Sequence, residues 1–228
     1  MTVDSGGHLT AQVNDFATEV ALLFDGVFED APAMVIERLN DRSVISPERS
    51  VPLRANGKLL AKLDVSLRCC LDSSRKYLAV EKSTFKLVAD LDRAPIIRWD
   101  YERKAHSKPT AHIQVHGHRG ALSHLLSQAG HASPHSMESL HIPVGGARFR
   151  PCLEDVVEFI ISDCQFDAKP GWQTVVTAGR ERWRRYQARS VVRDMPRDAA
   201  DVLRTLGYVV EPPANGHPPD SEKALHNW

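Results

Sequence analysis

The amino-acid sequence predicts a single α+β domain: an antiparallel meander sheet of about five to seven strands, with an N-terminal helix and three C-terminal helices. Three observations predict this fold class. Apolar residues recur every three or four residues near the N-terminus, alternate with polar residues in the middle of the chain, and return to helical spacing towards the end. Because no repeat or internal linker interrupts this order, the domain is expected to cover residues 8–210, between disordered ends at 1–7 and 211–228.

The first predicted elements are a helix and a hairpin. The helix is expected at residues 8–24, because one apolar stripe runs along it. The stripe consists of Leu9, Val13, Phe16, Ala17, Val20, Leu23 and Phe24. The Asp-Gly and Pro residues at 25–32 are expected to end this helix, and residues 33–50 carry no clear periodicity. Asn56-Gly57 then predicts a tight hairpin between strands 51–54 and 58–69, because both turn positions require a positive φ.

The rest of the chain completes the sheet and the helical layer. Further strands are predicted at residues 77–89, 96–102, 111–117 and 140–144. Helices are predicted at residues 119–129, 151–164, 172–193 and 197–206. Gly130 and Gly207 are well placed to end two of these helices, and residues 208–210 are expected to add an edge strand.

Composition and charge exclude several classes of protein. The chain carries 29 basic and 29 acidic side chains, so no global charge attracts it to nucleic acid or to an anionic membrane. The four cysteines form no CxxC motif, so a zinc ribbon is disfavoured and reduced thiols are expected. Neither a signal peptide nor a membrane span is recognisable, so we expect a cytoplasmic protein without membrane contact.

Histidines are concentrated in one part of the sequence. Eight of the eleven lie between residues 106 and 141: His106, His112, His116, His118, His124, His131, His135 and His141. Side chains two residues apart in a strand share a face. Within the predicted strand 111–117, His112, Gln114 and His116 therefore share one face, while Ile113 and Val115 face the core.

Neighbouring strands are expected to add a carboxylate and a guanidinium to this face. Arg98 and Asp100 alternate with apolar residues in strand 96–102, and His141 opposes the apolar residues around it. Imidazoles titrate near neutral pH, a carboxylate can orient one of them, and an arginine can hold an anion. The predicted catalytic set, which suits phosphodiester cleavage, is His112, His116, His141, Asp100 and Arg98.

Two other interpretations of the histidine face stay open. An antiparallel sheet often has one solvated face, which can carry polar residues without any function. A zinc site built from His116, His118 and a distant carboxylate is also open. Because the sequence lacks HExxH, we predict neither a metal ligand nor a cofactor.

Two arginine-rich stretches predict binding of anions. Arg148 and Arg150 follow two glycines and precede a helix, where free backbone N–H groups can receive a phosphate or carboxylate; a plain strand-to-helix turn is the alternative. The predicted helix 172–193 carries a run of arginines with Trp183 and Tyr186 between them, which can bind a nucleic acid backbone. Its predicted binding residues are Arg180, Arg182, Arg184, Arg185 and Arg189. The alternative is a solvated helix face with both aromatic rings packed inward.

A sequence pattern also suggests a family. The pattern comprises Arg98-Trp99-Asp100-Tyr101, then Pro109-x-x-His112-x-x-x-His116-Gly117, then His141-Ile142-Pro143. It resembles that of uncharacterised bacterial proteins with a strand–His–strand–His core and, more loosely, is similar to the TumE-type toxins of toxin–antitoxin systems. The resemblance implies an activity directed at RNA or translation, with His112, His116 and His141 as the matching positions.

The leading hypothesis from the sequence is therefore an RNA-cleaving or RNA-processing enzyme of toxin or defence type. Two alternatives belong to other classes: a non-enzymatic interaction or regulatory module with a protein partner, and a metal-dependent hydrolase. The sequence predicts no oligomeric state.

Overall fold

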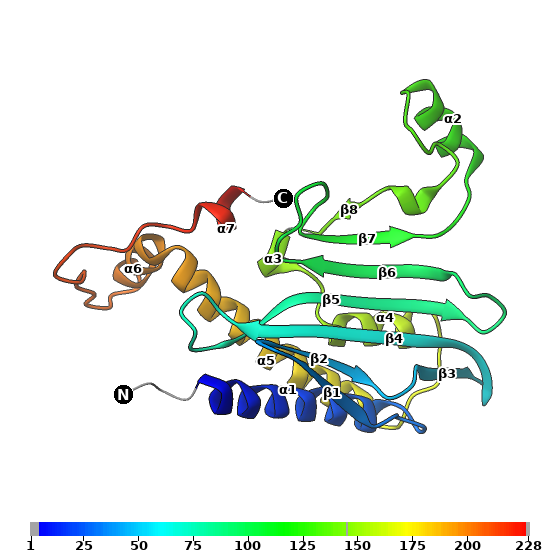
Figure 1. Ribbon diagram of the computed structural model, residues 1–228, viewed down its shortest axis with the longest axis horizontal. Coiled ribbons are helices and arrows are strands. Elements are labelled where there is room, and N and C mark those ends of the chain that lie inside the picture. The colour runs from blue at the N-terminus through cyan, green and yellow to red at the C-terminus, as the bar shows by residue number, and fades with distance from the viewer. Residues whose placement is uncertain (1–4, 145, 227–228) are drawn as a thin grey trace.

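The computed structural model describes residues 5–144 and 146–226. In Figure 1 one antiparallel sheet forms the centre of the molecule, with α1 (Ser5–Val27), α4 (Leu153–Ser162) and α5 (Trp172–Asp194) packed together beside it. The described strands form one eight-stranded sheet in the order β1-β2-β4-β5-β6-β7-β8, with β3 paired to β4. The predicted α+β class, with an N-terminal helix, an antiparallel sheet and C-terminal helices, is confirmed.

The sheet is a meander whose consecutive strands mostly pair with each other. Its strands are β1 (Met34–Leu39), β2 (Arg42–Pro47), β3 (Val51–Ala55), β4 (Lys58–Leu71), β5 (Leu78–Ala89), β6 (Pro95–Glu102), β7 (Ala111–Val115) and β8 (Ile142–Pro143). At the predicted hairpin between β3 and β4, Asn56 and Gly57 adopt φ values of 51° and 76°. Both values lie in the left-handed region that this kind of turn requires, so the hairpin prediction is confirmed.

Helix α1 is longer at both ends than the apolar stripe predicted. Residues 5–7 are helical, although they were expected to be disordered; residues 1–4 of that predicted end lie outside the described residues. The helix also continues through Gly26, where a side chain would collide with Val175 of α5. Gly26 thus permits close packing of two helices and does not end one. Val27 and Phe28 are 0% and 3% exposed, so the C-terminal end of the helix is buried.

The helices after the sheet follow the predicted order, with short additions. Besides α4 and α5 they are α2 (Gly120–Gln128), α3 (Gly146–Phe149), α6 (Pro196–Thr205) and α7 (Glu222–His226), with a 3₁₀ turn, η1, at Met137–Ser139. Helix α7 lies in the tail that was expected to be disordered; residues 227–228 lie outside the described part. The predicted edge strand at 208–210 is wrong: the segment pairs with no strand, and Val209 is 92% exposed. Among the described helices, none is long and apolar enough to cross a bilayer.

The hydrophobic core lies between the sheet and helices α1, α4 and α5. Phe24, Leu63 and Ile160 are completely buried there. Trp99 of β6 also faces this layer, with its ring 5.7 Å from that of Phe159 in an edge-on arrangement. Because side chains alternate along a strand, the neighbours of Trp99 in β6 face the opposite side of the sheet.

Candidate functional site

The polar face of β6 and β7 brings together side chains that the sequence predicted to converge. The two strands pair so that Asp100 lies opposite His112 and Arg98 lies opposite Gln114. These four residues alternate with Trp99 and Ile113, which belong to the core layer. The polar set therefore lies on the sheet face away from α1, α4 and α5.

Arg98 and Asp100 form an ion pair on this face, and the ring of His112 lies near their contact. An Nη2 nitrogen of Arg98 lies 2.8 Å from Oδ2 of Asp100. The same Oδ2 lies 3.9 Å from Nε2 of His112, too far for a direct hydrogen bond. A gap of this size between two polar atoms suits one bridging atom from a third group.

His112 is held in one tautomer by the backbone. Its Nδ1 atom lies 3.0 Å from the carbonyl oxygen of Pro109. A carbonyl can only accept a hydrogen bond, so Nδ1 carries the proton and Nε2 of the neutral ring carries the lone pair. Burial lowers the pKa of His112, which keeps the ring neutral at neutral pH.

Several buried polar atoms on this face have no hydrogen-bond partner. Among the described residues, the buried side-chain atoms without a partner are Arg98 Nε, Asp100 Oδ1, His112 Nε2, His116 Nε2 and Gln187 Oε1. All but the last belong to the predicted catalytic set. Buried polar groups are ordinarily hydrogen-bonded, so this cluster has free capacity to bind polar groups of a ligand.

His141 and His116 lie next to the cluster, one before β8 and one after β7. Strand β8 pairs with β7, and the His141 ring lies edge-on to the His112 ring, 4.7 Å away. The backbone N–H of His116 donates to the carbonyl of Ile96 at 2.8 Å, just beyond the end of β7. Both histidines are partly buried, so each can be reached from the surface.

The strand that carries His112 is shorter than predicted. Residues 111–117 were expected to be extended, but β7 ends at Val115, because β6 begins at Pro95 and offers no further partner beyond Ile96. His118 is consequently exposed and outside the sheet. Among the described residues, no group of three or more His, Cys, Asp or Glu side chains is arranged to hold a metal ion. Strand β8 is likewise restricted to Ile142–Pro143 of the predicted 140–144.

A segment that comes later in the sequence covers part of the site. Gln114 donates a hydrogen bond of 2.7 Å from Nε2 to the carbonyl of Glu138 in η1. The side chain of His112 is 0% exposed and that of Asp100 is 6% exposed, whereas that of Arg98 is 33% exposed. A molecule that arrives from solvent therefore meets Arg98 before it meets Asp100 or His112.

The burial of neutral His112 predicts a loss of stability in mild acid. Because its pKa in the folded state lies below the ordinary value of 6.5, the unfolded chain binds a proton more readily. The contribution of His112 to the free energy of unfolding should thus be complete above about pH 6.5 and be lost as the pH falls below it. Urea denaturation at a series of pH values should show this loss in the natural protein and a smaller one in His112→Gln. Equal slopes in both proteins would contradict the assignment.

The two arginines predicted to bind anions have different surroundings. Arg148 Nε lies 2.7 Å from Oδ2 of Asp194, so a carboxylate of the chain itself occupies Arg148. Arg150 is buried between two aromatic rings, with its guanidinium carbon 3.8 Å from the Tyr101 ring centre and 4.6 Å from that of Trp183. Gly145, the first glycine of the predicted turn, lies outside the described residues.

The arginines of α5 do not form one basic stripe. Arg180 pairs with Asp155 and Glu158 of α4, Arg182 lies 3.9 Å from Glu19 of α1, and Arg185 pairs with Glu181. The partners on α4 and α1, which are Asp155, Glu158 and Glu19, were missed by sequence reasoning. Within the described part of the chain, no ion pair involves Arg184 or Arg189. The surface predicted to bind nucleic acid is therefore reduced to a few exposed arginines.

No family model, curated protein or solved structure matches the chain. The resemblance to TumE-type toxins consequently stays a prediction from the sequence. The chemistry of the polar face of β6, β7 and β8 is the basis on which a function can be inferred.

Proposed function

We propose that the polar face of β6 and β7 is an acid–base site that cleaves RNA. The observation that supports this function is the cluster of buried, unpartnered polar atoms on Arg98, Asp100, His112 and His116. Cleavage of RNA by its own 2′-hydroxyl needs a base, an acid and positive charge beside the phosphate. Histidine and arginine side chains supply all three without a cofactor.

The degree of burial distinguishes the roles of the three histidines. His116 and His141 are partly exposed, so in this proposal one takes the proton of the 2′-hydroxyl and the other protonates the departing 5′-oxygen. The 2′-oxygen then bonds to phosphorus as the bond to the 5′-oxygen breaks. Arg98 stabilises the charge on the phosphate. His112 is fully buried and touches the His141 ring, so it acts as a positioning residue, in contrast to the proton-exchanging role expected from the sequence.

Asp100 supports the same site through Arg98. Its carboxylate fixes the guanidinium at 2.8 Å, which directs the cation towards the surface of the sheet. Arg184 and Arg189, the exposed arginines of α5 that have no ion pair in the described chain, belong to a helix packed on the other face of the sheet, so only an RNA chain that wraps around the sheet edge would reach them. With so few free cations, binding should be weak and should weaken further with added salt.

An assay with matched substrates tests the proposal. Purified protein is incubated with a single-stranded RNA and with a copy that carries 2′-deoxyribose throughout, each with and without EDTA. We expect cleavage of the RNA alone, products that end in a 2′,3′-cyclic phosphate, and no effect of EDTA. His124→Ala, a change at an exposed residue of α2, serves as the control and should cleave normally. Failure to cut RNA, or equal cutting of the deoxy copy, would overturn the proposal.

One observation favours a second candidate, a metal-dependent hydrolase. His112 donates from Nδ1 to a carbonyl, which leaves Nε2 free, as in many metal-bound histidines. Asp100 lies close enough to become a second ligand after a small shift. In the described chain a third ligand is not in position, so His116 or His141 would have to move. Loss of cleavage in EDTA and its recovery with Zn²⁺ would favour this candidate over the metal-free reaction.

A further inference from the structure

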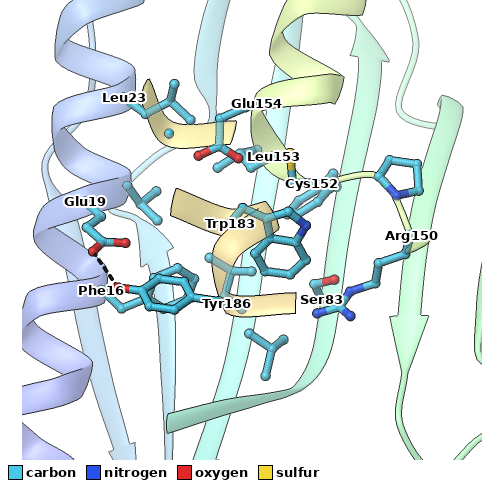
Figure 2. Close-up of a pocket in the computed structure, with 16 residues that line it drawn as sticks. Phe16, Glu19, Leu23, Ser83, Arg150, Cys152, Leu153, Glu154, Trp183 and Tyr186 are labelled. Atoms are coloured by element: carbon cyan, nitrogen blue, oxygen red, sulfur yellow. Dashed lines mark hydrogen bonds between the residues drawn. The ribbon is translucent and has the colours of Figure 1, made fainter. Parts of the chain in front are cut away.

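A cavity lies on the helical side of the sheet, and two of the residues that line it, Ser83 and Arg150, also border a smaller pocket beside Asp100 and His112. It has a volume of about 50 Å³ and is bounded by α1, α5, the start of α4 and strands of the sheet (Figure 2). Most of its wall is apolar, formed by Phe16, Val20, Leu67, Phe85 and Leu153. Since one water-sized group needs roughly 10–15 Å³, the enclosed part takes about four such groups, and a longer ligand has to extend into the mouth.

Arg150 brings a buried positive charge to one side of this cavity. The residue is only 8% exposed, and its guanidinium lies between the Tyr101 and Trp183 rings and donates to the carbonyl of Ala147. Burial lowers its pKa to about 10, so the side chain is still cationic at neutral pH. No carboxylate in the described chain forms an ion pair with Arg150. A buried charge of this kind is usually paired, and aromatic rings alone compensate it only in part.

Acidic groups line the opposite side of the cavity. Figure 2 shows Glu19 and Arg150 on opposite sides, with Trp183 and Tyr186 between them. Glu154 also lines the cavity. Its carboxylate lies against Gly179 of α5, where any larger residue would collide with it. Glu19 lies 3.9 Å from Arg182, whereas Glu154 has no ion pair within the described residues. The hydroxyl of Tyr186 donates to Oε1 of Glu19 at 3.5 Å, and Tyr186 is 47% exposed, so the cavity opens to solvent beside Glu19.

We infer that this cavity binds a small zwitterion, with its carboxylate against Arg150 and its ammonium group beside Glu154 and Glu19 at the mouth. A ligand of this class neutralises two unpaired charges of opposite sign on the walls of one cavity, and its short carbon chain packs against the apolar wall. Ser83, 5% exposed, lines the same side as Arg150 and offers a hydroxyl to the carboxylate. The inference does not depend on the proposed RNA cleavage, although Arg150 also borders the smaller pocket beside His112.

Three ligands of equal chain length test the inference: 4-aminobutanoate, butanoate and butylamine. Their affinities for the full-length protein are measured by isothermal titration calorimetry, and their effect on the melting temperature by thermal denaturation. We expect 4-aminobutanoate to bind and to raise the melting temperature, and each singly charged analogue to bind at least about ten-fold more weakly, a difference of about 1.4 kcal/mol. Binding of none of the three, or equal binding of butanoate and 4-aminobutanoate, would overturn the inference.

Variants at the two ends of the cavity locate the ligand. Glu154→Gln replaces a partly exposed side chain by one of similar shape, and it should reduce the affinity for 4-aminobutanoate towards that for butanoate, with Glu19 still present. Arg150→Met should abolish binding of both. Glu181→Gln is the matched control, because Glu181 is exposed on α5 and lies outside the cavity lining. This variant should bind all three ligands as the natural protein does. Unchanged binding in Glu154→Gln would contradict the inference even if Arg150→Met does not fold.

Discussion

Replacement of His116 by alanine is expected to slow RNA cleavage by about 10²–10⁴-fold, the contribution of one general acid or base. Nε2 of His116 is buried without a partner at the end of β7, yet the residue is partly exposed, so it can exchange a proton with a bound substrate. Initial rates on a labelled single-stranded RNA should show this loss in kcat, with KM little changed. Circular dichroism should show an intact fold, because the side chain is outside the core.

His118→Ala provides the matched control for this substitution. His118 is two residues further along the chain, is exposed, and lies beyond the end of the sheet. Its removal changes the same number of histidines and the same local charge, but it should leave the rate unchanged. Equal rates in both variants and the natural protein would remove His116 from the mechanism. Equal losses in both would point to a general effect of charge.

The elements predicted best from the sequence are those determined by local patterns. The hairpin at Asn56-Gly57 follows from two turn positions, and α4 and α5 follow from helical periodicity. Strands β1 and β2 had no prediction, because most of β1 is exposed and its side chains show little alternation. They are held by pairing with each other and with β4, which is information from distant parts of the chain.

The difference between local patterns and contacts from distant parts of the chain also applies to the candidate site. That Asp100 and His112 share a face could be predicted, because alternation along a strand is a local property. The complete burial of His112 could not, since its neighbour His141 and the covering turn η1 come much later in the sequence. The pairing of the α5 arginines was missed for the same reason. Their acidic partners Glu19 and Asp155 lie on other helices, and only the packing of α1 and α4 against α5 brings them close.

Phe24→Ala is expected to lower the free energy of unfolding by about 3–5 kcal/mol, the usual cost of truncating a buried phenylalanine. Phe24 is 0% exposed in the core beneath the sheet, and its ring lies 6.2 Å from that of Phe28. The lost free energy combines the hydrophobic contribution of burying the ring with the cost of the cavity that its removal leaves. Urea denaturation followed by circular dichroism measures it, through a lower midpoint at an unchanged slope.

Leu22→Ala on the same helix separates packing from helix formation. Leu22 is 60% exposed, and alanine favours helix at least as well as leucine, so this change should alter the free energy of unfolding by no more than about 0.5 kcal/mol. If both substitutions cost the same, Phe24 would not be packed beneath the sheet and α1 would not be docked there. The cavity would then lack the wall that carries Glu19, so the difference between these two variants also tests the helix arrangement on which the zwitterion site depends.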